Sequence, residues 1–177
     1  MTGPIIQSNR LDLVSMSPTF IEAALTGDRA GAEAIAGLAL PPAWPDEHDS
    51  RFLRLRLDQM RGDPASQQWL LRAMVLRNRA RSMVGHIGFH GSPEAVGRAE
   101  MGYTVMPNHR RQGYATEAAL AQMDWATREH GVHRFFVSIA PDNTSSLAMA
   151  AKLGFRQVGD QIDEEDGLEY VFELARR

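Results

Sequence analysis

The feature that most constrains this chain is a glycine turn between a strand-like run, residues 99–106, and a helix-like run, residues 114–130. A turn at such a junction leaves several backbone N–H groups unpaired where the helix dipole is positive. Gly113 has no side chain and Ala115 has a small one, so a phosphate can approach the backbone closely. The turn therefore predicts an anion site of diphosphate size, although a glycine at this kind of junction can also be there for steric reasons alone.

A second segment, about thirty residues further on, strengthens the anion-site interpretation because it repeats the pattern of a loop followed by a helix-like run. It begins with Pro141-Asp142-Asn143-Thr144-Ser145-Ser146 and ends with Lys152-Leu153-Gly154-Phe155. Arg110-x-x-Gly113-x-Ala115 resembles the acyl-CoA pyrophosphate loop of the GNAT superfamily of N-acetyltransferases, and Asn143-x-x-Ser146 resembles the start of its second cofactor helix.

The resemblance extends to one branch of the superfamily and covers about residues 5–175. Met101-Gly102-Tyr103 before the loop, Ala115-Thr116-Glu117-Ala118 after it and the early Asn9-Arg10-Leu11-Asp12-Leu13 are similar to the RimJ/RimL-type branch, which acetylates the N-termini of ribosomal proteins. The two motifs occur in the correct order and spacing. This resemblance implies the GNAT fold and an acetyl-CoA cosubstrate.

The order of predicted elements favours one α/β domain over residues 1–177, with no linker or repeat. Strands are expected at 5–14, 69–76, 83–89, 99–106, 134–139, 155–160 and 169–174, and helices at 18–25, 29–38, 46–61, 114–130 and 144–153. In the helix at 46–61 we expect Phe52, Leu55 and Gln59 to share one face. This order predicts a mixed sheet with helices on both faces. The resemblance implies the same fold class, with a mostly antiparallel central sheet of about seven strands.

Composition and charge exclude several classes of protein. The chain has 177 residues, of which 44% are apolar and 23% are charged, and its net charge is −3. This balance is ordinary for a globular protein and argues against nucleic acid as the main partner. The sequence has no apolar run near the roughly 20 residues of a membrane span and no signal-peptide pattern. We therefore expect a cytoplasmic protein with no membrane partner.

The absence of cysteine restricts the chemistry, because it removes disulfides, thiolate metal sites and a cysteine acyl-enzyme. An acyl group must then move directly to its acceptor or through a less common nucleophile. The six histidines do not form a cluster with metal-site spacing, so we expect no metal.

The strand before the loop carries the expected chemistry. The resemblance implies that the backbone N–H of Tyr103 polarises the acyl carbonyl and that Val105 pairs with pantetheine amides. An alkyl amine has a pKa near about 10.4 and attacks only when neutral, so a base must take its proton. Glu100 is the candidate base. A regular strand places Glu100 on the face opposite Tyr103 and Val105, so either a β-bulge turns it toward the site or it is a solvated carboxylate.

The remaining site residues follow from the two motifs. Asn143 is a candidate to hold the pantetheine arm and is also suited to cap a helix. Ser146, one turn on, is the candidate donor to the thiolate. The tyrosine that many relatives carry later in this helix is absent here, so the thiolate leaves either unprotonated or through Ser146. Lys152 either reaches the adenosine phosphates or is a solvated helix end. The predicted cofactor-binding set is Tyr103, Val105, Arg110, Arg111, Gln112, Gly113, Tyr114, Ala115, Thr116, Asn143 and Lys152.

The predicted function is the direct transfer of an acetyl group from acetyl-CoA to a primary amine, which would be a protein or peptide N-terminus or a small amine. The acidic run at residues 163–166 either attracts a cationic amine or is a solvated hairpin tip. The alternative function is a non-catalytic acyl-CoA-binding domain of the same fold. Dimers are common among similar proteins, so a homodimer is a further hypothesis.

Overall fold

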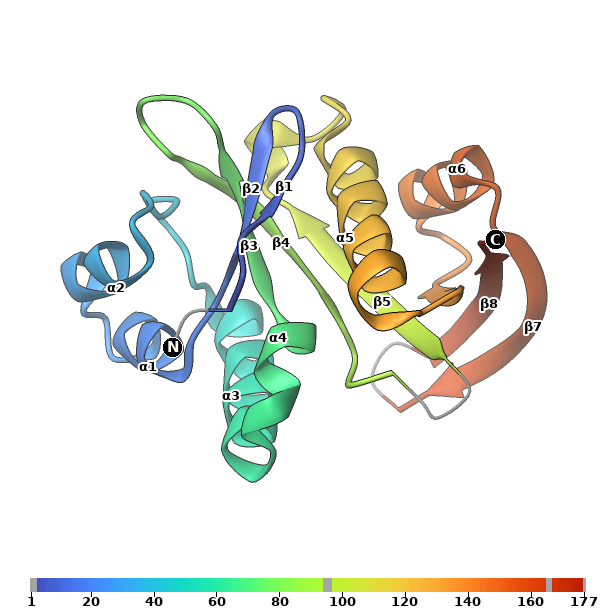
Figure 1. The fold of residues 1–177 in the computed structure, drawn as a ribbon, viewed down its shortest axis with the longest axis horizontal. Coiled ribbons are helices and arrows are strands. Elements are labelled where there is room, and N and C mark those ends of the chain that lie inside the picture. Colours follow the sequence, from blue (N-terminus) through green and yellow to red (C-terminus); the bar gives the residue numbers. More distant parts are fainter. Residues whose placement is uncertain (1–2, 94–96, 165–166, 177) are drawn as a thin grey trace.

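The computed structural model describes residues 3–93, 97–164 and 167–176. Its centre is a single eight-stranded sheet (Figure 1). The strands are β1 (Ile6–Gln7), β2 (Leu11–Ser15), β3 (Arg72–Leu76), β4 (Met83–Phe89), β5 (Arg98–Val105), β6 (Arg134–Ile139), β7 (Arg156–Asp163) and β8 (Gly167–Ala175). In the sheet they follow the order β1-β2-β3-β4-β5-β6-β8-β7.

Six α-helices connect and cover the strands: α1 (Pro18–Leu25), α2 (Arg29–Ala36), α3 (Glu47–Gly62), α4 (Gln67–Leu70), α5 (Tyr114–His130) and α6 (Thr144–Leu153). Short 3-10 helices follow α3, at Pro64–Ser66, and β5, at Pro107–His109. Among the described residues, no helix is both long and apolar enough to cross a membrane.

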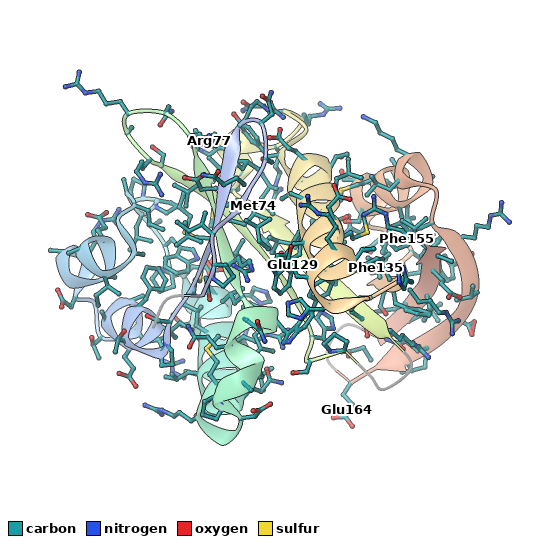
Figure 2. The ribbon with its side chains drawn as sticks, in the orientation of Figure 1. Met74, Arg77, Glu129, Phe135, Phe155 and Glu164 are labelled. Atoms are coloured by element: carbon teal, nitrogen blue, oxygen red, sulfur yellow. The ribbon has the colours of Figure 1, made fainter. Side chains whose placement is uncertain are left out.

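Two buried clusters lie on opposite faces of the sheet, because neighbouring residues of a strand point to opposite sides. Leu13 and Met74 belong to the cluster packed with α5 and α6, together with Phe135 (Figure 2). Val14 and Ala73 belong to the cluster packed with α1, α2 and α3. The predicted fold class, a mixed and mostly antiparallel sheet with helices on both faces, is confirmed.

The sheet has eight strands rather than about seven, because the predicted strand at 5–14 is broken by a turn. Ile6 pairs with Leu13 in an antiparallel hairpin, and the Ser8 N–H donates to the Leu11 carbonyl at 2.8 Å. Serine and asparagine favour turns because their side chains bond to nearby backbone. Residues 8–10 therefore form a turn between β1 and β2, and the side chains of this turn can contact other elements.

The structure differs from the sequence-based expectations at the start of the predicted strand at 69–76, and it shows which face of α3 is buried. Trp69 and Leu70, predicted in a strand, lie in α4, and both are buried there. The face of α3 that carries Phe52, Leu55 and Gln59 is not its buried face, since Leu55 is 54% exposed. The residues of α3 that are buried are Leu53, Arg56, Leu57 and Met60. A buried arginine on the inner face of this helix breaks the amphipathic pattern.

The parallel ladder between β5 and β6 is short. It runs only from the pair Arg98 and Arg134 to the pair Glu100 and Phe136. Beyond Glu100, β5 continues along β4, while β6 continues along β8. The two strands therefore separate beyond Glu100, in the middle of the sheet.

Gly88 on β4 marks a close approach of two backbones. A Cβ at this position would lie 1.6 Å from the carbonyl oxygen of Leu70, at the end of α4. We predict that Gly88→Ala lowers the free energy of unfolding by about 3 kcal/mol or more, because backbone must move to admit the methyl group. Thermal unfolding should show this as a fall in Tm of roughly 6–12 °C.

Gly159→Ala is the matched control, since Gly159 also lies in a strand but a Cβ there would meet nothing within 4 Å. Its free energy of unfolding should change by no more than about 0.5 kcal/mol. Equal losses in the two variants would contradict the packing of β4 against α4.

Candidate active site

The loop between β5 and α5 has the geometry of an anion site. Arg111 and Gly113 both have left-handed backbones, with φ of 61° and 81°, and this conformation is uncommon for arginine. No side chain caps α5, whereas α1, α2, α3 and α6 each begin with a capping side chain. The first N–H groups of this 17-residue helix have no partner in the first turn and are available to an anion.

Glu117 fixes this loop to the turn between β1 and β2. Its carboxylate accepts hydrogen bonds from the Ser8 hydroxyl and the Arg10 N–H, both at 2.6 Å, and from Arg10 Nε at 2.7 Å. Arg10 also donates to the Gln112 carbonyl at 3.0 Å and lies 4.6 Å from the ring centre of Tyr114. Burial raises the pKa of Glu117, but these hydrogen bonds and the charge of Arg10 outweigh it and lower the pKa overall. The loop is thus held by an ionised carboxylate.

A groove of about 770 Å³ extends from the loop to the start of α6. It lies on the α5–α6 side of the sheet, in the space that opens where β5 and β6 separate. All the predicted cofactor-binding residues except Gln112 and Lys152 line it, and so does Ser146. Lys152 is exposed in the last turn of α6. We call this space the donor groove.

The start of α6 forms the far wall of the donor groove. The Asn143 side chain accepts a hydrogen bond from the Ser146 N–H at 3.2 Å, so Asn143 is the N-cap of α6. The Tyr103 side chain reaches from β5 and hydrogen-bonds with Ser146. Burial raises the pKa of Tyr103 more than the bond with Ser146 lowers it, so its phenol is protonated at neutral pH. Two hydroxyl groups therefore lie together at this wall, one from β5 and one from α6.

A second cavity, of about 170 Å³, opens on the α3 side of the sheet. Its walls come from α3, β4 and β5 and include three histidines, His48, His86 and His90. Tyr103 and Thr104 line both this cavity and the donor groove. These two residues, beyond the last β5–β6 pair, form a wall that the two spaces share. We call the second space the acceptor cavity.

Glu100 faces away from the donor groove. The β4–β5 ladder is regular over its whole length, so no bulge turns Glu100 toward the Tyr103 face, and that alternative is wrong for this ladder. Its carboxylate accepts a hydrogen bond from Ser138 Oγ at 2.6 Å and lies 3.8 Å from His90 Nδ1. The acceptor cavity opens on this same face of β5. The Glu100 side chain is therefore on the correct side of the sheet to take part in deprotonating an amine bound there.

His90 connects Glu100 to the acceptor cavity. Its Nε2 lies over Gly102 on β5, where a Cβ would be only 2.8 Å away. Burial lowers the pKa of His90, and Arg56 lowers it further, while the negative charges of Glu100 and Asp163 raise it by less. The imidazole is therefore neutral at neutral pH. We assign its proton to Nδ1, which faces Glu100, so that Nε2 has a free lone pair.

His86 and Asp49 form another pair in the wall of the acceptor cavity. His86 Nε2 lies 3.8 Å from Asp49 Oδ1, and the His86 ring stacks on Phe52 with centres 5.4 Å apart. Burial raises the pKa of Asp49, but hydrogen bonds from His86 and the Asp46 backbone outweigh it and lower the pKa overall. The wall thus contains an ionised carboxylate. The sequence did not indicate this pair, because only the fold brings α3 and β4 together.

The acidic run at 163–166 is described only in part, since Glu165 and Asp166 lie outside the described residues. Glu164 is exposed and points away from the body of the molecule (Figure 2). Asp163 raises the pKa of His90, which places its charge near the acceptor cavity. Within the described part of the chain, no group of three or more His, Cys, Asp or Glu residues could hold a metal ion.

Comparison with known proteins identifies the family. The sequence model described as an acetyltransferase (GNAT) domain matches residues 10–156. The uncharacterized N-acetyltransferase YjdG of Bacillus subtilis is 27% identical over 154 residues, which cover 85% of this chain and 89% of YjdG.

Two solved structures share the fold. The ribosomal L7/L12 α-N-protein acetyltransferase RimL, in complex with coenzyme A, superimposes with a TM-score of 0.66 at 17% identity, over 98% of each chain. The microcin C7 self-immunity acetyltransferase MccE, in complex with acetyl-CoA and AMP, gives 0.60 at 16% identity, over 94% of this chain and 93% of MccE. Because the family match includes both the loop before α5 and the start of α6, the chain belongs to the acetyltransferase (GNAT) domain family and is an N-acetyltransferase.

Proposed function

We propose that this N-acetyltransferase moves the acetyl group directly from acetyl-CoA to a primary amine, either a peptide N-terminus or a small amine. The observation that carries the proposal is the wall that the donor groove and the acceptor cavity share at Tyr103 and Thr104. Two substrates can approach this point from opposite sides of β5 and bind at once. RimL, which shares the fold, is an acetyltransferase of a protein α-amine, and this supports the peptide class of acceptor.

The donor groove fits the shape and charge of coenzyme A. The open N–H groups at the start of α5 suit the pyrophosphate, and Arg110 and Arg111 add positive charge beside them. Along β5, the backbone at Val105 and Tyr103 would pair with the pantetheine arm and with the acetyl carbonyl. Asn143 would hold the arm from the opposite wall.

In the proposed reaction, His90 with Glu100 acts as the base. The amine lone pair attacks the thioester carbonyl, and the amine proton moves to His90 Nε2 while Glu100 stabilises the imidazolium that forms. The Tyr103 backbone N–H would stabilise the oxyanion of the tetrahedral intermediate. When the C–S bond breaks, Ser146 would pass a proton to the thiolate while it takes one from the Tyr103 hydroxyl, and solvent would then restore the proton of Tyr103.

Homodimer formation, the lack of nucleic-acid, membrane and metal partners, the cytoplasmic location and a single domain over residues 1–177 stay predictions from the sequence. The proposed roles of the individual site residues are tested by the two experiments that follow.

Gly113→Glu tests the donor groove. The substitution places a carboxylate where the pyrophosphate would bind, at a backbone with φ of 81°. We predict that calorimetric binding of acetyl-CoA is lost and that thiol release from acetyl-CoA stops for every amine in a panel. The non-catalytic alternative predicts instead that the unmodified protein binds acetyl-CoA but releases no thiol with any amine.

Gly131→Glu is the control, because Gly131 lies at the other end of α5 with a similar left-handed φ of 67° and open space around it. Backbone strain is similar in both variants, but only the first lies at the donor groove. Retained acetyl-CoA binding in Gly113→Glu would overturn the assignment of the loop.

The pH dependence of kcat/KM tests the base. Catalysis needs neutral His90, so activity should be present above its pKa and lost as the pH falls through it. The acid limb should lie below the ordinary histidine pKa of about 6.5, because burial and Arg56 lower the pKa of His90. Glu100→Gln removes a charge that raises this pKa, so the limb should move to still lower pH while the rate falls.

His90→Gln should lower kcat by about 10²-fold or more and abolish the acid limb. His133→Gln, at an exposed histidine outside both cavities, should leave the profile unchanged. An acid limb that survives in His90→Gln would assign the base to another group.

A further inference from the structure

Arg56 is a buried cation in the wall of the acceptor cavity. It is 6% exposed and projects from the inner face of α3. Its Nη1 donates to the Gln59 side chain at 2.9 Å and to the His90 carbonyl at 3.3 Å. Its guanidinium carbon lies 4.8 Å from the ring centre of Phe52. These partners are neutral, so they leave the charge itself uncompensated.

The rest of the guanidinium lacks a partner. Arg56 Nε is enclosed without a hydrogen bond, and Nη2 donates to no described residue. The carboxylate of Asp49, on the same helix, is paired with His86. A buried charge without an opposite charge is strongly unfavourable, so a ligand that supplies the opposite charge at Arg56 would be bound favourably.

Arg72, another buried arginine of the described residues, provides a comparison. Arg72 is 0% exposed, and its Nη1 and Nη2 donate to the carbonyls of Pro4 and Gln68 at 2.7 and 2.9 Å. It lines neither the donor groove nor the acceptor cavity. The Nε of Arg72, like that of Arg56, has no hydrogen-bond partner. The two residues differ in that both terminal nitrogens of Arg72 are bonded, whereas Arg56 adjoins a cavity and its Nη2 donates to no described residue.

We infer that the acceptor carries an anionic group, a carboxylate, that pairs with Arg56 while its amine lies at Tyr103 and Thr104. This inference rests on the proposed function. A carboxylate matches the planar, forked donors of a guanidinium, and Nε and Nη2 of Arg56 have no partner among the described residues.

The size of the acceptor cavity restricts the acceptor further. Its volume of about 170 Å³ is below the roughly 300–1,000 Å³ of sites for larger ligands. Only the end of the acceptor enters, so the amine and the carboxylate belong to one residue-sized unit. Two sources have this chemistry: a free amino acid, and a peptide whose first residue is Asp or Glu.

Matched pairs of acceptors test the inference and separate the two sources. The first arm compares β-alanine with β-alaninamide, and the second compares Asp-Ala-Ala amide with Asn-Ala-Ala amide, by thiol release from acetyl-CoA. We expect kcat/KM to favour the carboxylate member of at least one pair by about tenfold or more. In the first arm an amide lowers the pKa of a nearby amine, which favours the amide and makes that comparison stringent.

Arg56→Met should remove this preference, measured as the ratio of kcat/KM between the two members of each pair. Arg54→Met is the matched control, because Arg54 is exposed on the same helix and should leave the preference intact. Arg56→Lys keeps the charge but not the fork, so it should keep part of the preference. If Arg56→Met does not fold, the comparison of the acceptor pairs on the unmodified protein still decides.

Equal or better turnover of both amide members by the unmodified protein would overturn the inference and leave the proposed function standing. If none of the acceptors causes thiol release from acetyl-CoA, the proposed function is overturned instead. In that case the product analogue N-acetyl-β-alanine, added with coenzyme A, should raise the Tm of the unmodified protein but not of Arg56→Met. No such difference would overturn the anion site as well.

Discussion

The short parallel ladder between β5 and β6 is the constraint on which the rest of this structure depends. Only the segment from Arg98 to Glu100 pairs with β6, and each strand then follows a different neighbour. The space that opens beyond Glu100 becomes the donor groove, and the β5 residues that follow become a wall shared by two cavities. Without this separation, α5 and α6 would cover a continuous sheet, and no point in the fold would be reachable from both faces.

The charged groups around this opening divide into those that hold the fold and those that face a cavity. Glu117 and Arg10 tie the loop before α5 to the β1–β2 turn, so the strained backbone at Arg111 and Gly113 is kept in place by distant parts of the chain. On the α3 side, His90 and Arg56 face the acceptor cavity, where one is a neutral base and the other an uncompensated cation. The residues that would bind the acetyl donor therefore lie mainly on the α5–α6 side of β5, and those that would bind the acceptor lie mainly on the α3 side.

The parts of the site that could be predicted from the sequence are those fixed by local structure. A glycine before a helix and an asparagine N-cap act over a few residues, so Gly113 and Asn143 are recognisable without a fold. The pairing of Glu117 with Arg10 and of Glu100 with His90 joins elements that only the sheet brings together. The burial of Arg56 beside a cavity could not be predicted from the sequence, because it goes against the usual preference of arginine for the surface.

The central claim is that both substrates are bound together at Tyr103 and Thr104 when the acetyl group moves. Initial velocities measured over a grid of acetyl-CoA and acceptor concentrations test this most directly. A ternary complex predicts double-reciprocal lines that intersect. Parallel lines, the pattern of a ping-pong mechanism through an acetyl-enzyme, would contradict the account.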